Sequence, residues 1–490
     1  MMGTPLRIGM MTTRSLRLQA VAMAMLVGVA GVCGAKTPPP SDRTASCTSA
    51  YQNKAVPAKT LRAIVQSHGR WLTQRYNQDF HRADLCRADL RRAGLNDANL
   101  ERANLEGANL QHASLAHSTL ANARLKGADF TSAGLADGNL SGADMRGSRL
   151  SHANLSRVVA DEAALFNSML IGTRLHDAIF ERTHFDGADL TGADFTNASV
   201  VDSFFYGANL HRSTLTEADF MGTDLRHANL IQANLTKTNL QGALLDGARL
   251  RGARLLEADL EGAYFDEADL AEANLRGALL RGADLRFTNM HLTALQEADL
   301  EGANMEGARL VKTNGESANM TMAILYHAVL DDADLREARL DNAVLIGARG
   351  TGTIFTKADL NGVYAPRAAL RRASFNEAQL EGVNFVATDL RAATFKDANL
   401  THANLQEANL QEASFSGADL TAARLDGADI HHTVFQGTKL SGAVGLTQAQ
   451  LDTACVDQLT TLPPNLSRPA PCIPSKKAPR RGTSHLQNAR

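Results

Sequence analysis

Residues 98–110 read ANLERANLEGANL, in which Ala-Asn-Leu recurs every five residues. The same period runs without a slip from His81 to Gly445. Of the 73 positions between residues 85 and 445 whose numbers are multiples of five, 67 are Leu, Phe, Met or Ile. The residue two places earlier is always Ala, Ser, Thr, Gly or Val. A repeat this long must be interpreted before any single element.

A five-residue period fits neither an α-helix, which repeats every 3.6 residues, nor a strand, which alternates. It does fit a coil in which each five-residue unit forms one side, with the small residue and the large apolar residue pointing inward. Four such sides give a turn of 20 residues. About 18 turns, spaced like hydrogen-bonded strands at ~4.8 Å, would form a rod.

The repeated motif resembles that of the pentapeptide-repeat family, which is Ala, Asp or Asn, Leu and two variable residues. This resemblance covers about three quarters of the chain and implies an all-β solenoid, a right-handed four-sided β-helix. The chain shows the motif at Ala98-Asn99-Leu100, Ala258-Asp259-Leu260 and Ala418-Asp419-Leu420.

Five phenylalanines test the 20-residue turn independently. Because they are spaced by 20, we expect them to stack in the core on one side of the coil rather than to bind a ligand. They are Phe355, Phe375, Phe395, Phe415 and Phe435.

The chain outside the repeats predicts short segments of different character. The formal net charge is −2, and the repeat region is acidic while both ends are basic. We expect one solenoid, because each turn of a repeat array contacts only its neighbours. The predicted segments are a signal peptide (1–35), a linker (36–54), an N-terminal helical cap (55–80), the β-helix (81–445), a C-terminal helical cap (446–473) and a disordered basic tail (474–490).

The first 35 residues predict export. Basic residues precede an apolar run from Ala20 to Cys33, and Cys33-Gly34-Ala35 supplies the small residues of a cleavage site. The run is short for a membrane span. We expect cleavage after Ala35 and delivery to a bacterial periplasm, with a retained membrane anchor or a lipoprotein acylated at Cys33 as alternatives.

Each end of the solenoid is predicted to be covered by a helix. Before the repeats, Leu61, Ile64, Val65, His68 and Leu72 recur at helical spacing, and the His68–Leu72 segment resembles a stretch that precedes the repeats in the family. After them, Thr447 and Gln450 predict a capping box that starts a helix ending before Pro463. A homodimer through this C-terminal helix is one expectation.

The pattern weakens where the large apolar residue is lost, at Ala160, Gly315, Gly350 and Ala365. Such gaps cost packing, so we expect bulges, projecting loops or kinks within residues 310–320 and 347–366.

Four cysteines remain once the signal is removed, and they lie near the two ends of the rod. Cys455 with Cys472 could staple the tail, and Cys47 with Cys86 could tie the linker to the first turn. Four cysteines allow three pairings, so the sequence does not fix the connectivity. A structural zinc site would need closer Cys-x-x-Cys spacing.

No catalytic, cofactor-binding or metal motif stands out. The chain lacks a phosphate-binding glycine loop, a Gly-x-Ser-x-Gly elbow and a His-Glu-x-x-His pair. We therefore predict a non-enzymatic exported rod that binds a protein or other macromolecule, with nucleic acid a less favoured partner. Two alternatives stay open. One is a DNA mimic that binds a topoisomerase, as the family resemblance suggests, and the other is an enzyme of unrecognised type.

Overall fold

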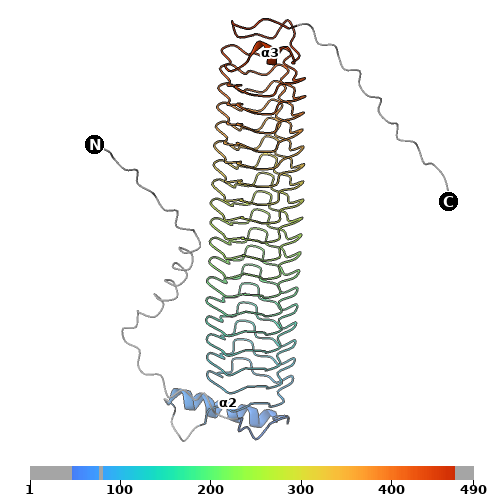
Figure 1. Cartoon of the computed structure of the whole chain (residues 1–490). Coiled ribbons are helices and arrows are strands. Elements are labelled where there is room, and N and C mark those ends of the chain that lie inside the picture. The colour runs from blue at the N-terminus through green and yellow to red at the C-terminus, as the bar shows by residue number, and fades with distance from the viewer. Residues whose placement is uncertain (1–46, 75, 77–80, 470–490) are drawn as a thin grey trace, which may run out of the picture. The chain divides into compact units, whose positions relative to one another are not determined.

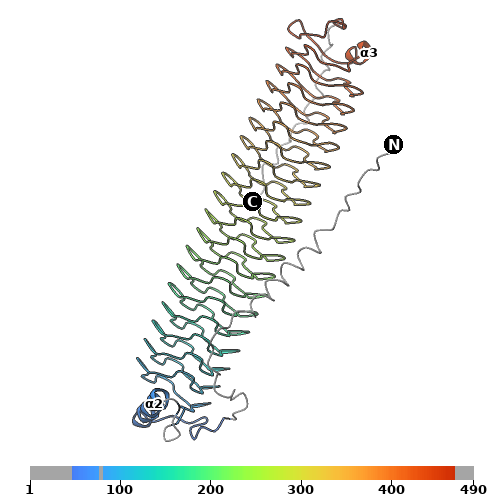
Figure 2. The ribbon, with the colours of Figure 1, turned by 90° about the vertical axis from the view of Figure 1, so that its left-hand side faces the viewer.

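The computed structural model describes residues 47–74, 76 and 81–469. The chain divides into two compact units, Met1–Thr48 and Ser49–Arg490. In the second unit the backbone winds into a β-helix whose coils stack along one axis (Figures 1 and 2). The predicted signal peptide and basic tail lie outside the described residues.

Each coil contains 20 residues, because parallel bridges join residues that are 20 apart, from Asp84↔Asn104 to Arg424↔Val444. The N–H of Leu85 donates to the carbonyl of Asn104 at 2.7 Å, and the N–H of Asn104 donates to the carbonyl of Ala83 at 2.9 Å. The same two bonds recur along the rod. The backbone of one coil is thus paired by the coils on either side.

Turns divide each coil into four five-residue units. In a unit, the residue whose number is a multiple of five is the central residue, and its neighbours are the pre-central and post-central residues. The next residue is the corner. The carbonyl of Leu100 accepts a hydrogen bond from the N–H of Ala103 at 2.9 Å, and the corner, Arg102, has φ = 59°. Every corner from residue 87 to residue 442 has a positive φ, as a type II turn requires at its third residue.

The central and small residues form a continuous core, and nearly all are at most 1% exposed. Where Thr replaces the small Ala, its hydroxyl donates to a backbone carbonyl. In most cases this carbonyl belongs to the preceding coil, as when Thr353 donates to Leu330 at 2.9 Å, but Thr223 and Thr288 donate within their own coil. The five phenylalanines predicted to stack do so, with ring centroids 5.0, 4.8, 4.5 and 5.4 Å apart in order from Phe355 to Phe435. The core hydroxyl groups are thus hydrogen-bonded, with Ser148 Oγ as the exception among the described residues.

The predicted loops at the weak points are absent, so that expectation is corrected. The ladder passes through them without interruption: the N–H groups of Gly315, Gly350 and Ala365 donate to the next coil at 2.7, 2.8 and 2.9 Å. Neighbouring side chains fill the space. A Cβ on Gly315 would lie 2.7 Å from Leu335 Cδ2, and one on Gly350 would lie 3.0 Å from Leu370 Cδ2.

Helix α2 (Ala58–Thr73) covers the first coil, within the predicted cap (Figure 1). Leu61 and His68 are its buried residues. His68 accepts a hydrogen bond at Nδ1 from the N–H of Ala83 at 3.1 Å, and its Nε2 lies 3.0 Å from the carbonyl oxygen of Glu101. The ring therefore carries its proton on Nε2 and joins the helix to two coils. Burial lowers the pKa of His68, which favours this neutral form.

The last coil is closed differently from our prediction. Helix α3 (Gln448–Leu451) starts with the predicted capping box between Thr447 and Gln450 but contains only four residues. The chain then extends, so that Cys455 pairs with Val434 and Thr461 pairs with Lys439. A longer helix would have left backbone N–H and C=O groups of the last coil without hydrogen bonds, and the extended chain forms those bonds instead.

Disulfide-bonded cysteines are found among the described residues near both ends of the rod. Cys47 and Cys86 form a disulfide, as one of the open pairings had it. Cys455 is also disulfide-bonded, and its predicted partner Cys472 lies outside the described residues. Among residues 47–74, 76 and 81–469, no helix is long and apolar enough to cross a membrane.

Candidate functional surfaces

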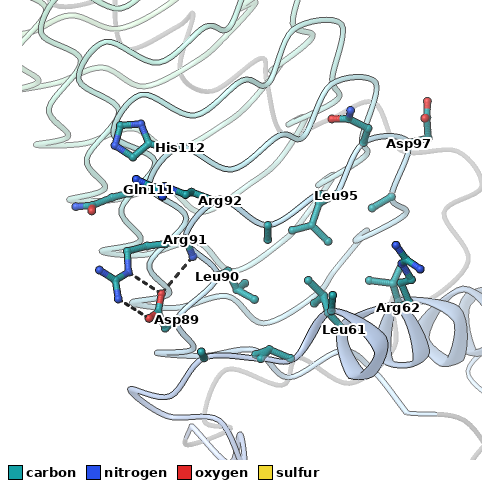
Figure 3. A pocket seen from close by; sticks show the side chains of 18 of the residues that line it. Leu61, Arg62, Asp89, Leu90, Arg91, Arg92, Leu95, Asp97, Gln111 and His112 are labelled. Atoms are coloured by element: carbon teal, nitrogen blue, oxygen red, sulfur yellow. Dashed lines mark hydrogen bonds and ion pairs between the residues drawn. The ribbon is translucent and has the colours of Figure 1, made fainter.

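An open groove of about 980 Å³ lies between helix α2 and the first coils (Figure 3). Its floor is apolar, with Leu61 of the helix opposite Leu90 and Leu95 of the coil. Arg91, Arg92, Gln111 and His112 gather at one end, and Arg62 and Asp97 lie toward the other.

Few groups in this groove are available for chemistry. Arg91 donates to both carboxylate oxygens of Asp89, at 2.9 and 2.8 Å, and this pair holds the pKa of Asp89 below its usual range. No Ser, Thr, Cys, Lys or Tyr lines the groove, so the hydroxyl, thiol and amine nucleophiles of covalent catalysis are missing from its walls. Within the described residues, no group of three His, Cys, Asp or Glu side chains could hold a metal ion. The groove is best explained as the seam between cap and rod.

The four units of a coil stack into four outer faces that share one backbone geometry. We name each face after its outward side chains. The first central residue of each face is given in brackets, and its later central residues follow at intervals of 20. These are the aromatic face (Leu85), the histidine face (Leu90), the mixed face (Leu95) and the acidic face (Leu100).

Charge is distributed unevenly over the faces. On the acidic face, carboxylates far outnumber Arg and Lys. Asp341 and Asp359 lie on adjacent coils, and the pKa of Asp359 is raised by its burial and by the neighbouring Asp341 carboxylate. On the histidine face, Arg and Lys outnumber Asp and Glu, and six histidines are added: His112, His152, His211, His291, His431 and His432.

The aromatic face carries every outward Phe and Tyr of the repeat region. Most of these rings are more than a third exposed, and Phe287 and Tyr206 are half exposed. Aliphatic side chains extend the apolar surface between them. The outward aromatic residues are Phe166, Phe204, Tyr206, Tyr264, Phe287, Tyr326 and Tyr364, and the aliphatic ones are Leu244, Ile324, Val344, Ile346, Pro366 and Val386.

Side chains of the aromatic face contact one another from coil to coil. His184 stacks between Phe166, at 4.7 Å, and Phe204, at 4.5 Å. Tyr206 meets His227 edge to face at 5.4 Å. The surface is therefore a packed array of rings rather than isolated apolar residues.

The aromatic face is not among the features predicted above from the sequence. The signal is present in the numbering, because Phe204, Tyr264 and Tyr364 differ by multiples of 20, as do Tyr206 and Tyr326. It is found only by applying the 20-residue period to the outward positions. The polar pre-central residues have a structural role: Asn99 Oδ1, for example, accepts a hydrogen bond from the N–H of Glu101 at 3.1 Å.

Comparison with known proteins identifies the family. Models of pentapeptide repeats match most of the repeat region, so the chain belongs to the pentapeptide repeat family. The model for pentapeptide repeats (8 copies) matches 77–107, 108–147, 161–197, 188–226, 205–242, 228–265, 243–282, 258–296, 293–332 and 328–364, and that for a pentapeptide repeat region matches 368–444. Members of this family are generally non-enzymatic scaffolds.

Three solved structures illustrate the likeness. HetL, a pentapeptide repeat protein involved in heterocyst differentiation regulation from the cyanobacterium Nostoc, is 32% identical over 47% of this chain and 89% of its own, with a TM-score of 0.23. A pentapeptide repeat protein from the Arabidopsis thaliana thylakoid lumen is 31% identical over 24% of this chain and 70% of its own, with a TM-score of 0.12. QnrB1, a plasmid-mediated fluoroquinolone resistance protein, is 16% identical over 44% and 94%, with a TM-score of 0.17. No curated protein sequence matches the chain.

Proposed function

We propose that this chain is an exported, non-enzymatic rod of about 18 four-sided coils that binds a protein through its aromatic face. The observation that carries the proposal is the confinement of all outward Phe and Tyr residues of the repeats to one face. The fold does not require it, because the other three faces form the same ladder without such residues. Aromatic side chains are enriched in protein interfaces and are frequent among the residues that dominate binding energy.

Export is supported by two features in the N-terminal part of the chain. The first 35 residues have the composition of a signal peptide. The disulfide between Cys47 and Cys86 is of the kind that persists in oxidising compartments. Fractionation of the cells and sequencing of the mature N-terminus test this part. We expect a periplasmic protein that begins at Lys36, whereas an intact N-terminus in the cytosol would refute export.

The binding surface is tested by placing a photo-crosslinking amino acid on matched positions of opposite faces in intact cells. Tyr206 and Tyr364 are replaced on the aromatic face. Leu256 and Ile354, which hold the equivalent post-central and pre-central positions, are replaced on the mixed face. We expect discrete protein adducts from the first two sites and none from the second two. Equal yields from both faces, or no adduct from either, would refute the proposed function.

A second candidate function is mimicry of DNA, and the acidic face is the observation in its favour. Its outward carboxylates recur along the rod, including Asp219, Asp259, Glu261, Asp299, Glu301 and Asp341. Arginines interrupt the series, and Arg281 neutralises Asp299 at 2.5 Å. If mimicry is the function, the purified chain inhibits DNA supercoiling by a topoisomerase, and the variants Glu261→Lys and Glu301→Lys lose that inhibition. We expect no inhibition.

A further inference from the structure

The aromatic face contains two apolar stretches separated by charged coils, and this pattern restricts what can cover it. The first stretch runs from Ala164 to Tyr206 and includes the stacked rings of Phe166, His184 and Phe204. The second runs from Ile324 to Val386. Between them, Asp224 pairs with Arg226 and Asp284 pairs with Arg286.

We propose that this face binds a second copy of the same chain, with the two rods side by side and parallel. This inference rests on the proposed function, in which the aromatic face is a protein-binding surface, and it names the partner. A two-fold axis parallel to the rods would place each coil against the same coil of the second copy. It would also exchange the outward positions, so that a pre-central residue faces a post-central one.

This arrangement brings apolar coils together over both stretches. Ile324 would face Tyr326 of the second copy, Val344 would face Ile346, and Tyr364 would face Pro366. Because the two-fold axis sets each coil against the same coil of the second copy, both apolar stretches are covered. The symmetry also fixes the register of one rod along the other.

The charged coils are self-complementary under the same axis. Asp224 would face Arg226 of the second copy, and His184 would face Asp186. In one chain, Arg226 already donates to Asp224 at 2.8 and 2.5 Å, and His184 lies 3.3 Å from Asp186. The Asp224–Arg226 pair would become a group of four side chains with alternating sign. Only Leu244 would face an aspartate, Asp246, as an aliphatic group against a carboxylate.

An antiparallel pair is less favourable. The antiparallel arrangement that joins the two apolar stretches is centred on Tyr264, and it sets pre-central residues against pre-central residues. Asp186 would then face Ile346, and Asp284 would face Leu244. Packing a carboxylate against an aliphatic side chain costs solvation, and the antiparallel arrangement has two kinds of such contact where the parallel arrangement has one.

The area of the face is sufficient for a specific dimer. The coils from Ala164 to Val386 extend over about 55 Å if they are spaced like hydrogen-bonded strands, and a side of three extended residues is about 10 Å wide. Two copies would then bury about 1,100 Å² in total, above the ~1,000 Å² expected of a specific interface.

The test measures the solution mass of the full chain by light scattering and compares two single substitutions. We expect a dimer for the native chain. Ile346→Arg would place a charged side chain against Val344 of the second copy and should give at least a tenfold loss of dimer affinity. Thr356→Arg, at the same post-central position on the mixed face, should leave the dimer intact. A monomeric native chain, or a dimer insensitive to Ile346→Arg, would overturn the inference.

A cysteine substitution distinguishes the orientations. Under mild oxidation, a mixture of Ile324→Cys and Tyr326→Cys chains should form disulfide-linked pairs in the parallel dimer, because these two positions face each other across the axis. The matched mixture of Ile354→Cys and Thr356→Cys chains on the mixed face should not. In the antiparallel arrangement the cysteines at 324 and 326 of the two copies would be about six coils, or ~29 Å, apart, and Ile324→Cys would instead link to Phe204→Cys. That result would overturn the parallel arrangement.

The same experiments separate failure of this inference from failure of the proposed function. If the photo-crosslinker at Tyr364 yields adducts with a different protein while the chain is monomeric, the face binds a partner and the second copy is the wrong one. If it yields no adduct and the chain is monomeric, both proposals fail.

Discussion

The aromatic face and the mixed face lie on opposite sides of each coil and differ only in what points outward. Both have the same parallel bridges, the same left-handed corners and the same buried central residues. One displays Tyr and Phe, and the other displays Thr, Asn and charged residues. Since the backbone accepts either set, the aromatic residues are not needed to build the rod. The difference assigns folding to the inward positions and recognition to the outward ones.

The largest effect should come from removing a ring on the inner side of the mixed face. Phe395 lies 4.8 Å from Phe375 and 4.5 Å from Phe415, and it is fully buried. Phe395→Ala should lower the free energy of unfolding by about 3–5 kcal/mol, because it removes stacking and leaves a cavity. Urea unfolding followed by circular dichroism measures this. A loss below ~1 kcal/mol would show that neighbouring coils collapse into the space.

The second effect concerns the end of the rod and depends on pH. His68→Gln would disturb the bonds to Ala83 and Glu101, for an expected loss of about 1–3 kcal/mol at pH 8. The pKa of His68 is lowered in the folded state, so the unfolded chain binds more protons once the pH falls below its unfolded value of about 6.5.

Native stability should therefore fall from pH 8 to pH 5.5 by more than that of the His68→Gln variant. Paired aspartates contribute a fall of the same sign in both proteins, so the difference between them isolates His68. Parallel pH dependences would contradict the assigned role of this ring.

A third, smaller effect tests the corners that define every side. Gly192 and Gly247 have φ = 65° and 64°; a Cβ would meet nothing within 4 Å at Gly192 but would lie 2.6 Å from His227 Nδ1 at Gly247. Gly192→Ala should cost about 1 kcal/mol, the strain of an L-residue in the left-handed region. Gly247→Ala should cost more. Equal unfolding midpoints for the two variants would show that His227 moves aside freely.

The smallest effect on folding should come from the outer surface of the aromatic face. Tyr364 is 46% exposed, so Tyr364→Ser should change the free energy of unfolding of the monomer by less than ~0.5 kcal/mol. Dilute urea titrations, below the concentration at which dimers form, provide the measurement. A loss comparable to that of Phe395→Ala would mean that the outward ring is part of the fold, and the contrast between the faces would disappear.

The sequence predicts the inward features of this molecule well, for a physical reason. A residue that repeats every five places is constrained by the same packing on every side, so Phe355 to Phe435 could be placed before the structure was known. Predictions failed where the environment was decided by neighbouring coils. Leu335 and Leu370 fill the space at Gly315 and Gly350, and extended pairing with the last coil displaces most of the helix expected after Thr447.

The candidate site was harder to predict, because no rule of packing constrains outward residues. His68 was interpreted correctly as part of the cap, although its two backbone hydrogen bonds could not be foreseen from spacing. The aromatic face required the period of 20 to be applied to positions that do not repeat in chemical type. Its aromatic residues occur at irregular intervals of coils, from Phe166 to Tyr364.

The most direct test of the central claim is hydroxyl-radical footprinting of the native chain at concentrations above and below the dimer midpoint. Two leucines on other faces serve as controls. Leu279 on the acidic face and Leu292 on the histidine face are 44% and 49% exposed, comparable to Tyr206 and Tyr364 on the aromatic face. The account predicts that Tyr206, Tyr326 and Tyr364 become protected at high concentration while the two leucines do not. If the oxidation of the three tyrosines does not change with protein concentration, the account is contradicted.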